Sequence, residues 1–452
     1  MRWMTVAMVF AAASGYVVMV LAAAVLGTDG ADRWLVFWSS FFAVAAVANG
    51  MLQETTRAVG EAQNQEGQKT QEAQEPQEGQ KGQKGQKTQA AQPVTAPAST
   101  TAARPNKPAN PLRTGGITGI GLGALAALTA LWWAPSVAPE NSLWAGILMA
   151  VGIASIFVQQ TVAGLLSGTN RWNRYAALLG MDAALRLAIA GLLSLDYLTV
   201  QMIPPAGYQI GFMIATVCGA ISWIIVIAAS RDRRSIVHAE VDVTGGQFWR
   251  NSLAAMAATV ATALMVTGFP ALVDLSLSIS PTTTAVPIAA LLYCVMLTRA
   301  PLLVPLTAFQ SAVVMFFLRR REQPLGALRA PVAGLVGLGI VGAGLAWAIG
   351  PWLFGLFLDD DFILPGSVLA VLTAASVGTA LLMLTGSAVL AHQRHRSYTL
   401  GWWAAAIAYI LLLLVPLDLV TRSALALAVG PLAGVAWHVA TLARLRPKYA
   451  SD

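Results

Sequence analysis

The residues best suited to chemistry in this sequence are charged side chains inside long apolar segments. Arg299 lies near the middle of segment 283–318, and Pro301 and Pro305 follow it. An ionised side chain is costly inside a membrane, so it usually faces a water-filled cavity or a partner. Proline removes a backbone donor, which predicts a kink in this helix near the arginine. Arg299 is therefore either an anion-binding residue in a cavity or an arginine paired within a packed bundle.

Asp182 and Arg186 lie together in another apolar segment, 175–195. A spacing of four residues places both side chains on one helix face, with the acid on the favourable N-terminal side. We therefore expect an ion pair. A structural pair is the favoured interpretation, and a contribution to substrate binding is the alternative.

Amide side chains near the ends of two more apolar segments form a third candidate set. They are either hydrated helix ends, which we favour, or part of a vestibule that opens to water, and the sequence leaves both interpretations open. The residues are Asn49 and Gln53 in one segment and Gln159 and Gln160 in the other.

Motifs of common enzyme classes are absent from the sequence. There is no Gly-rich phosphate-binding loop, no His-Glu-x-x-His and no serine-centred nucleophile elbow, which argues against ATP hydrolysis and proteolysis. Cys218 and Cys294 lie in apolar segments, as small buried residues do, and His392 and His395 extend a basic cluster. The sequence predicts no enzyme activity, no cofactor and no metal site.

The composition is that of a polytopic membrane protein. Hydrophobic residues make up 56% of the chain and charged residues 11%, whereas soluble domains have roughly 25% charged residues. A bilayer core about 30 Å thick needs about 20 apolar residues per helix. About twelve segments meet this requirement: 4–26, 34–53, 115–134, 142–166, 175–195, 210–229, 251–272, 283–318, 331–350, 364–390, 398–416 and 421–442.

The gaps between these segments alternate in charge. Arginine and lysine concentrate in cytoplasmic loops, so the alternation predicts the orientation and places both termini in the cytoplasm. We interpret segment 4–26 as a retained helix and not a cleaved signal peptide, because its removal would destroy the alternation. The basic residues thus reflect topology, and we predict no nucleic-acid partner. Basic gaps hold Arg57, Arg171, Arg174, Arg231, Arg233, Arg234, Arg319, Arg320, Arg321, Arg394 and Arg396; the others hold Asp29, Asp32, Glu140, Asp196, Asp274, Asp359, Asp360, Asp361 and Asp418, with Arg33 and Arg422.

Glycines recur at helical spacing in two segments, which predicts close packing of these helices against neighbours. They are Gly115, Gly119 and Gly123 in the third segment, and Gly334, Gly337, Gly339, Gly342 and Gly344 in the ninth.

Residues 57–112 interrupt the membrane pattern. Glutamine occupies every third position from Gln65 to Gln92, and a Pro-, Ala- and Thr-rich stretch follows. Such a segment buries too little apolar area to offset the entropy of ordering it, so we expect a disordered cytoplasmic linker. A tolerated insertion is the favoured interpretation. A docking site for a cytoplasmic partner is the alternative.

Several short motifs resemble the multidrug/oligosaccharidyl-lipid/polysaccharide (MOP) exporter superfamily, in particular its polysaccharide-biosynthesis flippase branch. The motifs are Gln53 to Arg57, Gly168 to Tyr175 with Asp182 to Arg186, and Tyr293 to Pro301 with Arg319, Arg320 and Arg321 at the basic end. The last of these is similar to the helix that bears cavity arginines in those proteins.

The resemblance implies two six-helix lobes that rock about a substrate site between them. The expected organisation is helices 1–2 in 1–56, the linker 57–112, helices 3–6 in 113–232, a connector 233–250 and helices 7–12 in 251–452.

The resemblance also implies a cargo, an oligosaccharide carried on undecaprenyl diphosphate and moved to the outer leaflet of a bacterial inner membrane. Arg299 would bind the diphosphate through charge-assisted hydrogen bonds, and Arg57 would meet it at the cytoplasmic mouth. Expected partners are membrane lipids and the lipid-linked oligosaccharide, and a glycan polymerase or another envelope-biosynthesis protein is a candidate partner for 57–112. The alternatives are a cation-coupled multidrug antiporter and a non-transporting scaffold. The candidate substrate-binding residues are Arg299, Arg57, Asn49, Gln53, Asp182 and Arg186.

Overall fold

The structure is a computed structural model that describes residues 2–74, 108–239, 241–282, 284, 286–308, 310–320, 322–392 and 394–445. The described residues form helices and no named strand; one isolated β-bridge joins Pro108 to Thr244. The helices are α1 (Arg2–Gln74), α2 (Pro111–Val137), α3 (Ser142–Gly168), α4 (Trp172–Thr199), α5 (Pro205–Cys218), η1 (Gly219–Ile221), α6 (Ser222–Ala228), α7 (Arg233–Val237), α8 (Gly245–Val266), α9 (Phe269–Ile279), α10 (Ile288–Ala308), α11 (Gln310–Leu318), α12 (Gly326–Gly355), η2 (Asp360–Phe362), α13 (Gly366–Ala391), α14 (His395–Leu413) and α15 (Leu419–Ala443).

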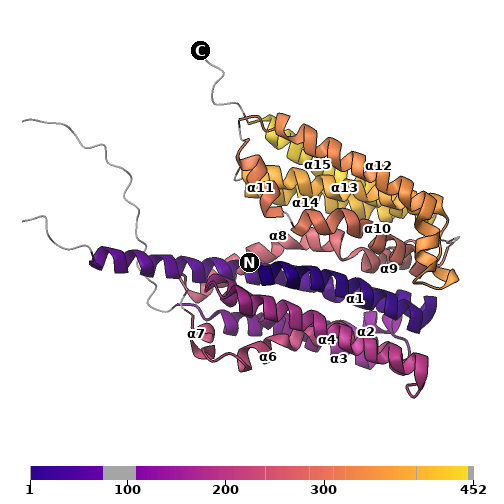
Figure 1. The fold of residues 1–452 in the computed structure, drawn as a ribbon, viewed down its shortest axis with the longest axis horizontal. Helices are drawn as coiled ribbons and strands as arrows, with labels where there is room; N and C mark the ends of the chain where they lie inside the picture. The colour runs from indigo at the N-terminus through magenta and orange to yellow at the C-terminus, as the bar shows by residue number, and fades with distance from the viewer. Residues whose placement is uncertain are drawn as a thin grey trace, which may run out of the picture.

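Helix α1 contains two of the predicted spans. Gly27 has φ 63° and ψ −174° inside it, a left-handed conformation that glycine adopts without steric cost. The chain turns back there, and Figure 1 shows the first leg running from the N-terminus to one end of the molecule and the second leg returning past it. The predicted gap between these spans is therefore a turn at one glycine, and Asp32 lies in the first turns of the second leg.

Another span consists of two helices in series, α8 and α9. They are bent by 77° at residues 267–268, where Pro270 in the first turn of α9 lacks the N–H that would continue α8. Helix α10 continues through Pro301 and Pro305. The kink beside Arg299 stays a prediction, and the 77° bend lies in the preceding span.

The described residues contain eight helices that are long and apolar enough to cross a membrane, or nine with the bent pair α8–α9. Counting both legs of α1 and adding α10–α11 and α14 gives the twelve predicted spans. Figure 1 shows α1 to α7 on one side of the molecule and α8 to α15 on the other. The predicted fold class, an all-α protein of about twelve membrane helices in two six-helix lobes, is confirmed.

Residues 57–74 of the predicted linker are helical and continue α1. The helix persists because Ala58 and Val59 are fully buried and the Ala58 carbonyl accepts a bond from Asp242 N at 3.2 Å. On the other side, the Asn110 side chain caps α2 by accepting from Arg113 N at 3.0 Å. The rest of the predicted linker, 75–107, lies outside the described residues.

The glycine predictions have different outcomes in the two segments. A Cβ on Gly119 would lie 2.6 Å from Ala154 O, and Gly115 and Gly123 also abut α3, so α2 packs closely on it as predicted. In α12, by contrast, Gly334, Gly337 and Gly344 have no non-local atom within 4 Å of such a Cβ. The other two predicted glycines, Gly339 and Gly342, face Val377 and Thr373 of α13, so two of the five serve helix packing and three do not.

The tightest crossing between the lobes joins α1 to α8. A Cβ on Gly50 would lie 2.4 Å from Met256 N, and Thr259 Oγ1 donates to Val47 O at 3.3 Å.

We expect Gly50→Ala to lower the melting temperature of the purified protein, because the added methyl forces two backbones apart.

Gly60→Ala is the matched control, since nothing lies within 4 Å of its Cβ position in the same helix. Alanine is favoured over glycine in a helix by about 1 kcal/mol, so this variant should be as stable as the wild type or more so. Equal melting temperatures for the two variants would show that the crossing is not tightly packed.

Candidate functional site

Arg299 on α10 is buried at the seam between the lobes. Only 3% of the residue is exposed. Its Nη2 donates to the Met265 carbonyl on α8 at 3.0 Å, and its Nη1 is buried without a hydrogen-bond partner. No described residue forms an ion pair with it, so its charge is uncompensated in this part of the chain.

The bend between α8 and α9 supplies the acceptor for Arg299. In a continuous helix the Met265 carbonyl would accept the N–H of Phe269, but α9 starts afresh at Phe269 after the break. The N–H groups of Thr267 and Gly268 instead both bond to Ala263 O, at 3.0 and 2.9 Å. The helix break therefore determines where the guanidinium is anchored.

Two tyrosines share this environment. Tyr409 on α14 is fully buried, and its hydroxyl has no hydrogen-bond partner among the described residues. Its ring packs edge-on against Phe269, with the two ring centroids 6.5 Å apart. Tyr16 on the first leg of α1 is half-buried and lies in the neighbourhood of Arg299. A guanidinium N–H and a phenol that both lack a partner are suited to bind an oxyanion. We call Arg299, Met265, Tyr16 and Tyr409 the arginine site.

A water-filled cavity around Arg299, one of the two predicted possibilities, is not seen. The guanidinium is enclosed, because only 3% of Arg299 is exposed and its Nη2 reaches across to the Met265 carbonyl of α8, while α10 itself packs on α13 and α1. The structure thus holds the arginine site in an occluded form.

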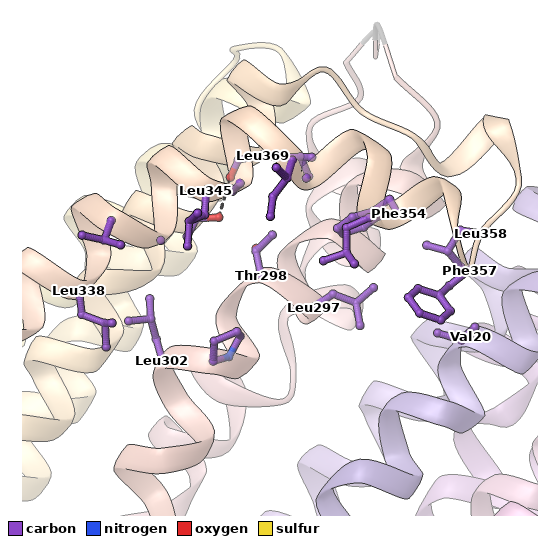
Figure 2. A pocket seen from close by; sticks show the side chains of 18 residues that line it. Val20, Leu297, Thr298, Leu302, Leu338, Leu345, Phe354, Phe357, Leu358 and Leu369 are labelled. Atoms are coloured by element: carbon purple, nitrogen blue, oxygen red, sulfur yellow. Dashed lines mark hydrogen bonds between the residues drawn. The ribbon is translucent and has the colours of Figure 1, made fainter.

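The large pocket next to this site is apolar. It has a volume of about 530 Å³ and lies between α10, α12 and α13, with Val20 of α1 at one end. Figure 2 shows Leu297 and Leu302 of α10 facing Leu345 and Phe354 of α12 across it. We call this pocket the apolar crevice.

Asp182 and Arg186 form the predicted ion pair, with Nη2 and Oδ1 2.7 Å apart. Arg186 is 4% exposed and also donates to the Thr216 carbonyl, and its guanidinium lies 4.7 Å from the centre of the Phe42 ring. The amide of Gln159 lies 3.3 Å from Asp182 Oδ1. These contacts compensate the charges within the N-terminal lobe, which favours the structural interpretation of the pair.

Asp182→Asn should destabilise the protein by about 3–5 kcal/mol, because it leaves the charge of Arg186 buried and unpaired. The double variant Asp182→Asn/Arg186→Gln should recover much of that loss, since no unpaired charge remains. Melting temperatures in detergent would measure both effects. A double variant less stable than the single one would contradict this structural role.

Arg57 is engaged by two carboxylates at the cytoplasmic end of the seam. Its Nε and Nη2 donate to Glu54 at 2.9 and 2.8 Å, and its Nη1 donates to Asp242 at 2.9 Å. Glu54 also accepts from Asn251 Nδ2 of α8 at 2.9 Å. One arginine with two acids gives a net negative cluster, which does not favour a diphosphate.

The remaining candidates are less engaged. Asn49 is half-buried and Gln53 is exposed on the second leg of α1, and neither side chain forms a hydrogen bond to a described residue. The structure therefore brings Asp182 and Arg186 together but does not join them, Arg57, Asn49 or Gln53 to Arg299.

Sequence reasoning missed several polar residues at the seam. Asp32 has a buried Oδ1 without a partner and lines a cavity of about 40 Å³ with Asp274 of α9. Its place in a predicted loop concealed it, because the turn at Gly27 was not foreseen. Tyr16 and Tyr409 could have been noticed only as aromatic residues with a polar tip inside apolar segments.

The fold is that of MOP superfamily transporters. The structure superposes with a TM-score of 0.65 on an inward-facing multidrug resistance MATE family transporter of that superfamily, which is 13% identical, with 97% of this chain and 96% of that one covered. The TM-score is 0.63 for the lipid II flippase MurJ in an inward closed conformation, at 12% identity and 99% and 88% coverage. A MOP superfamily transporter from Pyrococcus furiosus gives 0.57, at 13% identity and 98% and 95% coverage.

Sequence relatives define the family more narrowly, and no family model matches the chain. Uncharacterized protein Rv3630 of Mycobacterium tuberculosis is 34% identical over 431 residues, which cover 95% of this chain and 89% of the relative. Uncharacterized protein Rv1510 of the same species is 34% identical over 436 residues, with 96% and 89% covered. Uncharacterized protein Mb3654 of Mycobacterium bovis matches as Rv3630 does. The chain belongs to the family of these mycobacterial proteins.

Proposed function

We propose that this protein is a flippase that moves an undecaprenyl-diphosphate-linked oligosaccharide from the cytoplasmic to the outer leaflet of the inner membrane by alternating access. The observation that carries the proposal is the arginine site, where a buried guanidinium has an Nη1 without a partner and no neutralising acid among the described residues. The role is transport without catalysis.

The position of the arginine site suits a carrier that opens alternately to the two sides. Its residues come from α1 of one lobe and from α8, α10 and α14 of the other, so movement between the lobes opens or closes it. A buried donor without a partner costs about 1–3 kcal/mol. An anionic oxygen that enters the opened seam would satisfy both Arg299 Nη1 and the Tyr409 hydroxyl, which favours anion binding.

The comparisons support the class of the proposed cargo. The lipid II flippase MurJ superposes on 99% of this chain with a TM-score of 0.63, and a diphosphate head suits a guanidinium donor. The multi-pass architecture requires membrane lipids as surroundings. A bacterial inner membrane and a glycan polymerase or another envelope enzyme as partner belong to the same proposal.

Arg299→Gln should slow transfer of a fluorescent undecaprenyl-diphosphate glycan across reconstituted vesicles by about 10- to 100-fold, because hydrogen bonds to a charged group contribute about 1.5–3 kcal/mol. A quencher that cannot cross the bilayer would report the rate. Glutamine keeps a donor for the Met265 carbonyl, so the fold should persist.

Arg422→Gln is the matched control. Arg422 is also fully buried in the C-terminal lobe and also donates to a carbonyl, that of Ser280 at 3.0 Å, but it lies at the start of α15 and outside the arginine site. Its substitution should leave transfer within about twofold of wild type, a difference well below 1 kcal/mol. Equal loss in both variants, or wild-type transfer by Arg299→Gln, would remove the arginine site from the mechanism.

A cation-coupled multidrug antiporter is the second candidate, and the buried Oδ1 of Asp32 that lacks a partner is the observation in its favour. Such an antiporter needs a carboxylate that binds a proton or sodium. Asp32→Asn should then abolish cation-driven drug efflux from vesicles, whereas a flippase should show no such efflux in the wild type.

The scaffold alternative depends on the segment between α1 and α2. Replacing residues 75–107 with about ten Gly and Ser residues, which can span the roughly 25 Å between the end of α1 and the level of Arg57, preserves both the Arg57 cluster and the bond from Ala109 N to Val243 O at 2.9 Å. We expect unchanged transfer in vesicles, because the replacement touches neither lobe. Loss of polymer export in cells with normal transfer in vesicles would instead favour a docking role for this segment.

A further inference from the structure

The apolar crevice offers no free hydrogen-bond donor among its described lining residues. Its two hydroxyl side chains are both bonded to their own helices, Thr298 to Cys294 O at 2.6 Å and Thr373 to Leu369 O at 2.7 Å. The rest of the wall is aliphatic, aromatic, proline or glycine. Its volume of about 530 Å³ lies in the range of about 300–1,000 Å³ that is typical of ligand pockets. Only hydrocarbon fits this chemistry.

The crevice borders the lipid. Helix α12 forms one wall of the crevice. Only 6% of the residues in its most apolar 18-residue stretch are buried in the protein, compared with 67% for α13. Exposed α12 residues such as Leu338, Leu345 and Leu353 lie along this wall. A chain in the bilayer can therefore enter from the side.

The length of the crevice distinguishes between kinds of lipid. Its α12 wall runs from Leu338 to Leu353, which is about 22 Å at 1.5 Å per helical residue. One leaflet of a bilayer core about 30 Å thick is about 15 Å deep. The crevice is thus longer than an ordinary acyl chain occupies, and it suits a polyprenyl chain that reaches into both leaflets.

The crevice adjoins the arginine site through two helices. Thr298 and Leu302 of α10 line the crevice, while Arg299 on another face of the same helix points into the seam. On α1, Val20 lines the crevice one helical turn beyond Tyr16 of the arginine site. We propose that the crevice binds the polyprenyl chain of the transported lipid while Arg299 binds its anionic head. This inference rests on the proposed function and adds the site of the chain.

Glycines of α12 provide a matched pair of variants. Gly342 lines the crevice, and a Cβ there would make one ordinary contact, 3.5 Å from Thr373 Cγ2, so Gly342→Leu fills the crevice without a backbone clash. Gly344 lies two residues further on the same helix, has nothing within 4 Å, and does not line the crevice. Gly344→Leu therefore adds the same side chain on the outer surface.

The experiment uses a photoreactive polyprenyl monophosphate in vesicles of phosphatidylethanolamine and phosphatidylglycerol, with labelled peptides mapped by mass spectrometry. Wild type should be labelled on α10 and α12 around Leu302 and Leu345. Gly342→Leu should reduce labelling and glycolipid transfer by about tenfold, since it displaces the chain from a buried apolar surface. Gly344→Leu should change neither by more than about twofold.

The outcomes separate this inference from the proposed function. Equal labelling of the crevice by photoreactive phosphatidylglycerol, or normal transfer by Gly342→Leu, would overturn the polyprenyl site and leave the flippase proposal intact. Absence of transfer by wild type would instead overturn the flippase proposal. Crevice labelling that persists in Arg299→Gln but is lost in Gly342→Leu supports separate sites for head and chain.

Discussion

The hydrogen bond between Arg299 and the Met265 carbonyl is the interaction on which the proposed site depends. Inside a membrane every backbone polar group needs a partner, and the 77° bend between α8 and α9 removes one from Met265. The Nη2 of Arg299 takes the place of the missing N–H donor to Met265, and its Nη1 remains without a partner. The same bend thus fixes the guanidinium at the seam and leaves it able to bind more.

The two lobes treat their buried arginines differently. In the N-terminal lobe, Arg186 has a carboxylate at 2.7 Å and a ring face at 4.7 Å, so its charge is compensated locally. Arg299 has only a carbonyl and neighbouring phenols among the described residues. Arg422 in the C-terminal lobe also has only a carbonyl partner among the described residues and two buried nitrogens without one, but it lies at the start of α15. Lack of compensation together with a position at the seam between the lobes therefore singles out Arg299 as the ligand-binding arginine.

Helix α1 connects the elements that a transport cycle would move. Its first leg contributes Tyr16 to the arginine site and Val20 to the apolar crevice. Its second leg crosses α8 at Gly50 and carries Glu54 and Arg57, whose bonds to Asn251 and Asp242 join the lobes at the cytoplasmic end. Separation of the lobes on that side must break these bonds. Movement of α1 therefore links the opening of the seam to changes in the arginine site and the apolar crevice.

Features that depend on local spacing and composition could be predicted from the sequence. Apolar length gave the spans, and a spacing of four residues gave the Asp182–Arg186 pair. The sequence also identified Arg299 as the arginine to examine. Only the tertiary structure shows that Arg57 contacts Asp242, 185 positions away, that a 77° bend lies between α8 and α9, and that α12 packs on α13 but is separated from α10 by a crevice. The reason is physical. Helix periodicity is a property of the local sequence, whereas the compensation of a buried charge and the formation of a pocket depend on which distant helices pack together.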